Sequence, residues 1–189
     1  MSIRELTLMG NPVLLEVAQP ITDLDDPELQ ILIDDMVATM EEAAGIGIAA
    51  PQVGQSRRLI VALPIQDRNE EREPPMILLN PVLEPLDDEM VDGLEGCLSI
   101  PGLRGIVPRH RRVRYRALDR TGEPIEGIAE DLFARILQHE VDHLDGILFT
   151  MRMTDLRLLA MQSEAHYLAR SEADSEAPED DEEEAGPSA

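Results

Sequence analysis

Residues 138–146 of the chain read Gln-His-Glu-Val-Asp-His-Leu-Asp-Gly, and they contain the pattern H-E-x-x-H at His139, Glu140 and His143. On a helix, positions i and i+4 lie one turn apart on the same face, so both imidazoles can bind one metal ion. The glutamate between them can then reach a water molecule activated by the metal. The stretch therefore favours a helix suited to metal-assisted hydrolysis, although two ordinary surface histidines would give the same five letters.

The sequence around this pattern predicts an amphipathic helix from about Glu130 to Asp145, closed by Gly146. Apolar residues recur there at helical spacing: Leu132, Ile136, Leu137, Val141 and Leu144. His139 and His143 fall on or beside this stripe, and a buried polar group is costly without a partner. A metal ion is one such partner.

A catalytic metal also needs a third protein ligand and an open position. Cys97 is the only cysteine of the 189 residues, which excludes an intramolecular disulfide. Gly96 and Pro101 on its two sides predict a turn or loop rather than a helix. From these residues alone, Cys97 is a small buried apolar residue, a nucleophile with a histidine base, or the thiolate that completes a Cys-His-His metal site.

The segment GIGIAAPQ, residues 45–52, is small, apolar and punctuated by glycine. Such a stretch lets the backbone approach a ligand closely. The side chain of Gln52 could donate a hydrogen bond to an oxygen that becomes negative during attack. Taken without the other motifs, the same segment predicts a buried strand or turn that ends in a solvated glutamine.

Together, GIGIAAPQ (45–52), EGCLSIP (95–101) and QHEVDHLDG (138–146) resemble the three signature motifs of the peptide deformylases, in the bacterial type with a C-terminal helix. The likeness begins near Ile3, passes through Arg104, Val107 and Arg109, and continues beyond Gly146. Residues 66–74 and the C-terminal tail, both acidic, depart from it, and neither touches the predicted chemistry.

The resemblance implies that Cys97, His139 and His143 bind one divalent metal ion. That ion is Fe(II) in the native family enzyme, and Zn, Ni or Co are possible in purified protein. The resemblance also implies that Glu140 acts as general base and general acid. The implied reaction removes the formyl group from the N-terminal formylmethionine of nascent polypeptides and releases formate.

The resemblance further assigns residues to the substrate. The backbone N–H of Leu98 and the side chain of Gln52 would hold the formyl oxygen, and the backbone of Gly47 would hold the peptide. The pocket for the first side chain, usually methionine, would be lined by Ile46, Leu132 and Ile136.

Two other functional classes remain open. The H-E-x-x-H pattern alone would also fit a zinc metallopeptidase, which would cleave unformylated peptides. A metal-binding homologue without turnover is the third class, although the presence of Glu140 and Gln52 argues against it. As a deformylase, the chain is expected to act as a monomer on N-formylmethionyl nascent peptides, transiently near ribosomes, without a nucleic-acid-binding motif.

The composition points to one acidic domain with a tail. The chain has 16 basic and 39 acidic residues, a net charge of −23. We expect a single catalytic domain over residues 1–170 and a disordered acidic tail over 171–189, which has no basic residue. The start of the chain lacks the apolar segment of a signal peptide, and no apolar run approaches the length of about 18 residues that a membrane span needs. With one free cysteine, these features predict a cytoplasmic protein.

The remaining patterns predict an α+β fold. Strands are expected at 58–63, 76–84, 112–118 and 125–129, with a hairpin turn at 119–122. A helix with core methionines should begin at Pro27 after an Asp26 cap and stop at Gly45. A last helix is expected from Thr154 to about Arg170. Since strands and helices do not alternate, we expect mostly antiparallel or mixed sheets around a central metal-binding helix, with helices near both termini.

Three further side chains carry weaker signals. His110 and His166 have no motif around them and are expected to be solvated. Arg109 lies in a short basic cluster, which fits a solvated edge strand. It could instead pair with Glu95 behind the metal loop and thereby orient the metal ligands.

Overall fold

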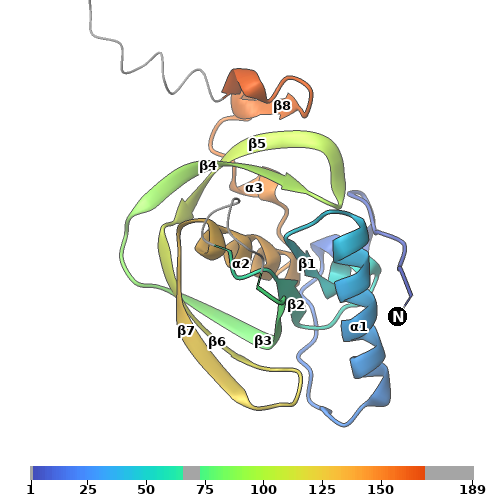
Figure 1. Ribbon diagram of the computed structural model, residues 1–189. Coiled ribbons are helices and arrows are strands. Elements are labelled where there is room, and N and C mark those ends of the chain that lie inside the picture. Colours follow the sequence, from blue (N-terminus) through green and yellow to red (C-terminus); the bar gives the residue numbers. More distant parts are fainter. Residues whose placement is uncertain (1, 66–72, 169–189) are drawn as a thin grey trace, which may run out of the picture.

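The computed structural model describes residues 2–65 and 73–168 of the chain. Most of the acidic stretch at 66–74 and the whole tail predicted for 171–189 lie outside these residues. In the described part, two antiparallel sheets surround one central helix, α2 (Asp131–Leu144), which carries the H-E-x-x-H pattern (Figure 1). The predicted α+β fold, with antiparallel sheets around a metal-binding helix, is confirmed.

The larger sheet has five strands in the order β1-β2-β3-β6-β7, and each neighbouring pair is antiparallel. Its strands are β1 (Gly47–Ala49), β2 (Leu59–Ala62), β3 (Met76–Pro85), β6 (Arg112–Leu118) and β7 (Pro124–Glu130). The last four lie at the predicted positions. The hairpin turn between β6 and β7 is also confirmed, because Gly122 N–H donates to the Asp119 carbonyl at 3.0 Å.

The smaller sheet has three strands in the order β4-β5-β8. Its long hairpin, which arches over α2 in Figure 1, consists of β4 (Met90–Cys97) and β5 (Ile100–His110). Neither strand was predicted, because β4 contains acidic residues and glycines that disfavour strands. Cys97 is the last residue of β4, and the two-residue turn that follows it corresponds to the loop expected there.

Helix α1 (Pro27–Glu42) begins as predicted, since the side chain of Asp26 accepts the N–H of Glu28 at 2.9 Å. It ends earlier than predicted. The left-handed residue is Ala44 (φ 51°), and Gly45 donates its N–H to the Met40 carbonyl at 2.8 Å. Together with the bond from Ala44 N–H to the Glu41 carbonyl at 3.0 Å, this bond forms a Schellman motif whose left-handed position lies one residue before Gly45.

The helix predicted from Thr154 to Arg170 is wrong over most of its length. After α2 come α3 (Phe149–Arg152), the 3-10 turn η3 (Leu156–Leu158) and strand β8 (Leu159–Met161). Within the predicted span, α-helical residues appear only at 166–168, and 169–170 lie outside the described residues. The exposed edge of β5 explains the difference: β8 pairs with it at residues 103–105, which satisfies edge N–H and carbonyl groups.

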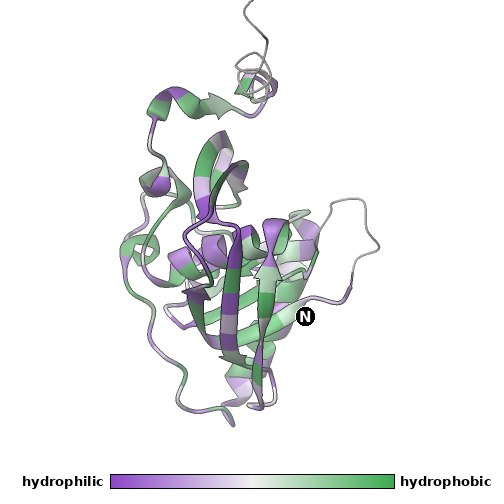
Figure 2. Ribbon diagram, turned by 90° about the vertical axis from the view of Figure 1, so that its left-hand side faces the viewer, coloured by the Kyte–Doolittle hydropathy of each residue, from purple (hydrophilic) through white to green (hydrophobic). Residues whose placement is uncertain are grey.

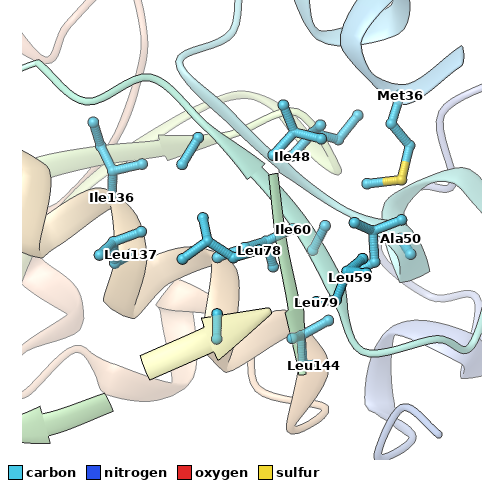
Figure 3. Close-up of a cluster of buried hydrophobic side chains, with 14 of the residues drawn as sticks. Met36, Ile48, Ala50, Leu59, Ile60, Leu78, Leu79, Ile136, Leu137 and Leu144 are labelled. Atoms are coloured by element: carbon cyan, nitrogen blue, oxygen red, sulfur yellow. The ribbon is translucent and has the colours of Figure 1, made fainter. Parts of the chain in front are cut away.

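The core lies between α2 and the five-stranded sheet. Figure 3 shows Ile136, Leu137 and Leu144 of α2 beside side chains from β2 and β3, and Met36 of α1 approaches the same cluster. Met36 and Met40 are fully buried, as expected for core methionines. Figure 2 shows hydrophobic and hydrophilic residues alternating along several strands, the pattern of sheets that bury one face.

A second, smaller apolar cluster includes Cys97, Ile100 and Val107, from the β4–β5 hairpin, and Phe149 of α3. Helix α2 is therefore held between two packed regions, with one face toward each sheet. The 3-10 turns η1 (Pro12–Leu15) and η2 (Ala50–Val53) complete the described elements. Among the described residues, no helix combines the length and apolar character needed to cross a bilayer.

Candidate metal centre

Cys97, His139 and His143 come together at the junction of β4 and α2. The sulfur and one ring nitrogen of each histidine all lie within 4.8 Å of one another, and Cys97 Sγ is 3.2 Å from His143 Nε2. All three residues are buried, His143 completely, which excludes two solvated surface histidines. A thiolate and two imidazoles suit a divalent transition metal such as iron or zinc rather than magnesium or calcium.

Strand β4 and helix α2 place these side chains opposite one another. Side chains alternate along β4, so Glu95 and Cys97 point to the same face, toward α2. Side chains four apart on α2 share one face of that helix. As a result His139 lies opposite Glu95, and His143 lies opposite Cys97.

Glu95 orients His139. Its Oε2 lies 2.8 Å from His139 Nδ1, which leaves the other ring nitrogen, Nε2, free for a metal. Arg109 donates to both oxygens of Glu95, at 2.9 and 3.0 Å, so the predicted pairing is confirmed. Burial alone would raise the pKa of Glu95, but hydrogen bonds from His139 and Arg109 lower it to about 2. The carboxylate therefore stays ionised behind the ligand.

Sequence reasoning missed the outer part of this network. Arg109 also donates to Asp142, and Arg152 of α3 binds the same carboxylate with Nη2–Oδ1 at 2.7 Å. Asp142 is buried and lies within the metal-binding motif itself. The position of Asp142 between the two histidines in the sequence could have indicated its place in this network, whereas nothing in the sequence indicated Arg152.

Glu140 is buried beside the ligands, and its Oε2 has no hydrogen-bond partner among the described residues. Burial raises the pKa of this carboxyl group to about 7. The side chain packs directly on Gly47: a Cβ added there would lie 2.9 Å from Glu140 Cδ. Position 47 therefore requires glycine for Glu140 to keep this place.

Gln52 is also buried, so the alternative of a solvated glutamine is wrong. Its Oε1 accepts the N–H of Ala49 at 2.8 Å, which fixes the orientation of the amide. The Nε2 end then faces Cys97 Sγ at 3.5 Å. Leu98, half-buried, follows Cys97 in the turn.

A cavity of about 710 Å³ opens onto this cluster. It is lined by nine of the ten predicted site residues: Ile46, Gly47, Gln52, Cys97, Leu98, Leu132, Ile136, His139 and Glu140. The tenth, His143, is fully buried. His166 is exposed as expected, but His110 is not simply solvated: it is half-buried, and its Nδ1 is buried without a hydrogen-bond partner in the described part of the chain.

The sequence model of the polypeptide deformylase family matches residues 3–158. The chain belongs to this family. Its curated relatives include peptide deformylase 1 of Bordetella pertussis, 51% identical over 157 residues that cover 82% of this chain and 89% of the relative. Peptide deformylase 1 of Xanthomonas campestris is 44% identical over 168 residues, 87% of this chain and 98% of the relative.

Solved structures agree with this assignment. The Met-Ala-Ser-bound class I type b peptide deformylase of Acinetobacter baumannii has a TM-score of 0.76 and 38% identity, and the match covers 81% of this chain and all of that one. A peptide deformylase of Legionella pneumophila has a TM-score of 0.73 and 35% identity, with 94% of this chain covered. The chain is thus a metal-dependent peptide deformylase with a Cys-His-His site, which excludes the peptidase and the homologue without turnover.

Proposed function

We propose that this deformylase removes the formyl group from N-terminal formylmethionine of nascent polypeptides and that Fe(II) is its native metal. The arrangement of Cys97, His139 and His143 beside Glu140, whose Oε2 has no hydrogen-bond partner in the described part of the chain, carries the proposal. A soft thiolate among the ligands favours iron or zinc, and Ni or Co would fit the same donors in purified protein.

A divalent cation at this site supplies Lewis-acid chemistry that makes water nucleophilic near neutral pH. Glu140 acts as the general base: it lines the cavity, its Oε2 has no hydrogen-bond partner among the described residues, and it accepts the proton of the attacking water. The same carboxyl group then returns a proton to the leaving amine. The products are formate and a free N-terminus.

The formyl oxygen gains negative charge during attack and needs hydrogen-bond donors. The backbone N–H of Leu98 and the Nε2 of Gln52 serve as these donors. Two contacts support this role for Gln52: Ala49 N–H holds its oxygen, so its nitrogen is directed to the side of Cys97 where the oxyanion would form.

The substrate binds along the cavity. The backbone of Gly47 holds the peptide, and the first side chain enters an apolar part of the cavity lined by Ile46, Leu132 and Ile136. Met-Ala-Ser in the similar Acinetobacter baumannii structure supports a peptide ligand of this kind.

The remaining parts of the proposal concern the whole chain. Residues 1–170 act as one catalytic domain, supported by the family match over 3–158. Because the substrates are formylated nascent peptides, the enzyme works in the cytoplasm and transiently near ribosomes. The proposed working form is a monomer. No nucleic-acid-binding motif takes part.

The test compares formyl-Met-Ala-Ser with Met-Ala-Ser, using protein purified without oxygen and with its metal content measured. Formate release from the first peptide, together with about one iron per chain, is expected. Cleavage of a peptide bond in the unformylated peptide would contradict the reaction. Full activity with zinc as the only metal found after anaerobic purification would contradict the assignment of iron.

A further inference from the structure

The metal-binding face of α2 continues one turn beyond the ligands to Arg135. This residue lies four positions before His139, just as His139 lies four before His143, so the three share one face. On β4, Gly93 precedes Glu95 and Cys97 at the same alternating positions. Arg135 and Gly93 therefore form the next opposed pair after His139 and Glu95.

Several hydrogen bonds hold the guanidinium of Arg135 across β4 and β5. Its Nη1 donates to Glu95 Oε1 at 2.8 Å and to the Val107 carbonyl at 2.7 Å. Its Nη2 donates to the Val91 carbonyl at 2.6 Å. The side chain is only 13% exposed. A guanidinium with this many fixed acceptors has one orientation, so its position between β4 and β5 is fixed.

Gly93 leaves the space that this guanidinium occupies. A Cβ added at position 93 would lie 2.7 Å from both Cζ and Nη2 of Arg135. No real side chain tolerates that separation, so any residue larger than glycine would displace the guanidinium. The pair at 93 and 135 is thus sterically matched.

Arg135 stands between two cavities. It lines the cavity of about 710 Å³ that contains the metal ligands and also a second cavity of about 390 Å³. Leu94 and Leu132 are the other residues common to both linings. Leu132 belongs to the proposed pocket for the first substrate side chain, so this pocket residue and Arg135 both border the second cavity.

We propose that Arg135 is a specificity-determining residue: its guanidinium, anchored on β4 and β5, closes the pocket for the first substrate side chain and limits the length of that side chain. The inference rests on the proposed function, because it takes this cavity to be the pocket for that side chain. Without the guanidinium, the two cavities would join, and longer unbranched side chains would be accommodated.

The test measures kcat/KM of the metal-loaded full-length enzyme for two tripeptides, formyl-norleucyl-Ala-Ser and formyl-2-aminodecanoyl-Ala-Ser. Norleucine has the length of methionine, and 2-aminodecanoate adds four methylenes. Arg135→Ala should shift the ratio of the two kcat/KM values toward the longer substrate by about tenfold or more, since each methylene that becomes buried favours binding. Arg157→Ala, at a position 90% exposed and outside both cavities, removes the same charge and should leave the ratio unchanged.

An equal fall in kcat/KM for both substrates would overturn the proposal, because it would show that Arg135 only supports Glu95. If Arg135→Ala does not fold, Arg135→Leu removes the guanidinium with less loss of packing and should give the same shift. The proposed function is checked separately, by the wild-type enzyme on formyl-norleucyl-Ala-Ser. If the wild-type enzyme is active on that substrate but neither Arg135→Ala nor Arg135→Leu shifts the ratio of the two kcat/KM values, the role of Arg135 is refuted and the proposed function is not.

The steric match gives a readout independent of activity. Gly93→Ala should lower the melting temperature of the wild-type protein, because the new methyl group displaces the guanidinium. In the Arg135→Ala background, Gly93→Ala should lower the melting temperature much less. An equal loss in both backgrounds would show that Gly93 does not make room for Arg135.

Discussion

Glu140 is buried among the metal ligands without being one of them, so its role can be separated from theirs. Glu140→Gln keeps the size of the side chain but cannot accept a proton. Deformylation should fall by about 10²–10⁴, the usual effect of losing an acid–base group, while metal content stays unchanged. Cys97→Ala provides the contrast, since metal and activity should be lost together. A Glu140→Gln protein that loses its metal would show that Glu140 is a ligand.

For single residues, the sequence predicted the contacts that local spacing or the order of the motifs could encode. The i, i+4 histidines met on one helix face, and Arg109 met Glu95 as one of the two alternatives allowed. The contacts of Asp142 with Arg152 and of Arg135 with Glu95 were not predicted. These contacts depend on how α3 and the β4–β5 hairpin pack against α2, and no local sequence pattern indicates that packing.

Among the elements, the start of α1 makes a separate prediction. Asp26 caps the helix through Glu28 N–H and also pairs with Arg57 at 2.9 Å. Asp26→Ala should destabilise the protein by about 1 kcal/mol, whereas Asp26→Asn should cost clearly less, because asparagine caps equally well. Chemical denaturation measures both. Equal losses would mean that the ion pair, and not the cap, stabilises this end of the helix.

The elements also show where sequence patterns fail. β2, β3, β6 and β7 belong to one sheet with a buried face, and their apolar residues marked them. The β4–β5 hairpin has most of its β4 side chains exposed, so the periodicity that identifies a half-buried strand is weak there. The segment after Thr154 had acceptable helical composition, but an open sheet edge decided its conformation, and that edge belongs to a strand more than 50 residues earlier.

For the molecule as a whole, charge is the dominant feature. Residues 171–189 carry acidic residues without a basic one in a chain of net charge −23. Ribosomes are polyanions, so these charges should oppose association over a Debye length of about 8 Å at physiological salt. Deleting 171–189 should leave turnover of a short formyl peptide unchanged and strengthen co-sedimentation with ribosomes, most clearly at low salt.

A matched variant with every acidic residue of 171–189 replaced by its amide keeps the length and should behave like the deletion. Weaker ribosome binding in either variant would show that the tail is an attachment element.

The Cys-His-His site also makes the metal part of the folding equilibrium. Cys97 and His143 are 46 residues apart in sequence, and an unfolded chain does not keep such donors within one coordination sphere. Binding is therefore linked to the native state, and free metal at 100 times its dissociation constant adds about 2.7 kcal/mol to the free energy of unfolding. The melting temperature should climb with the logarithm of free metal concentration and drop on chelation. For a cell, metal scarcity would then lower the amount of folded enzyme as well as its turnover.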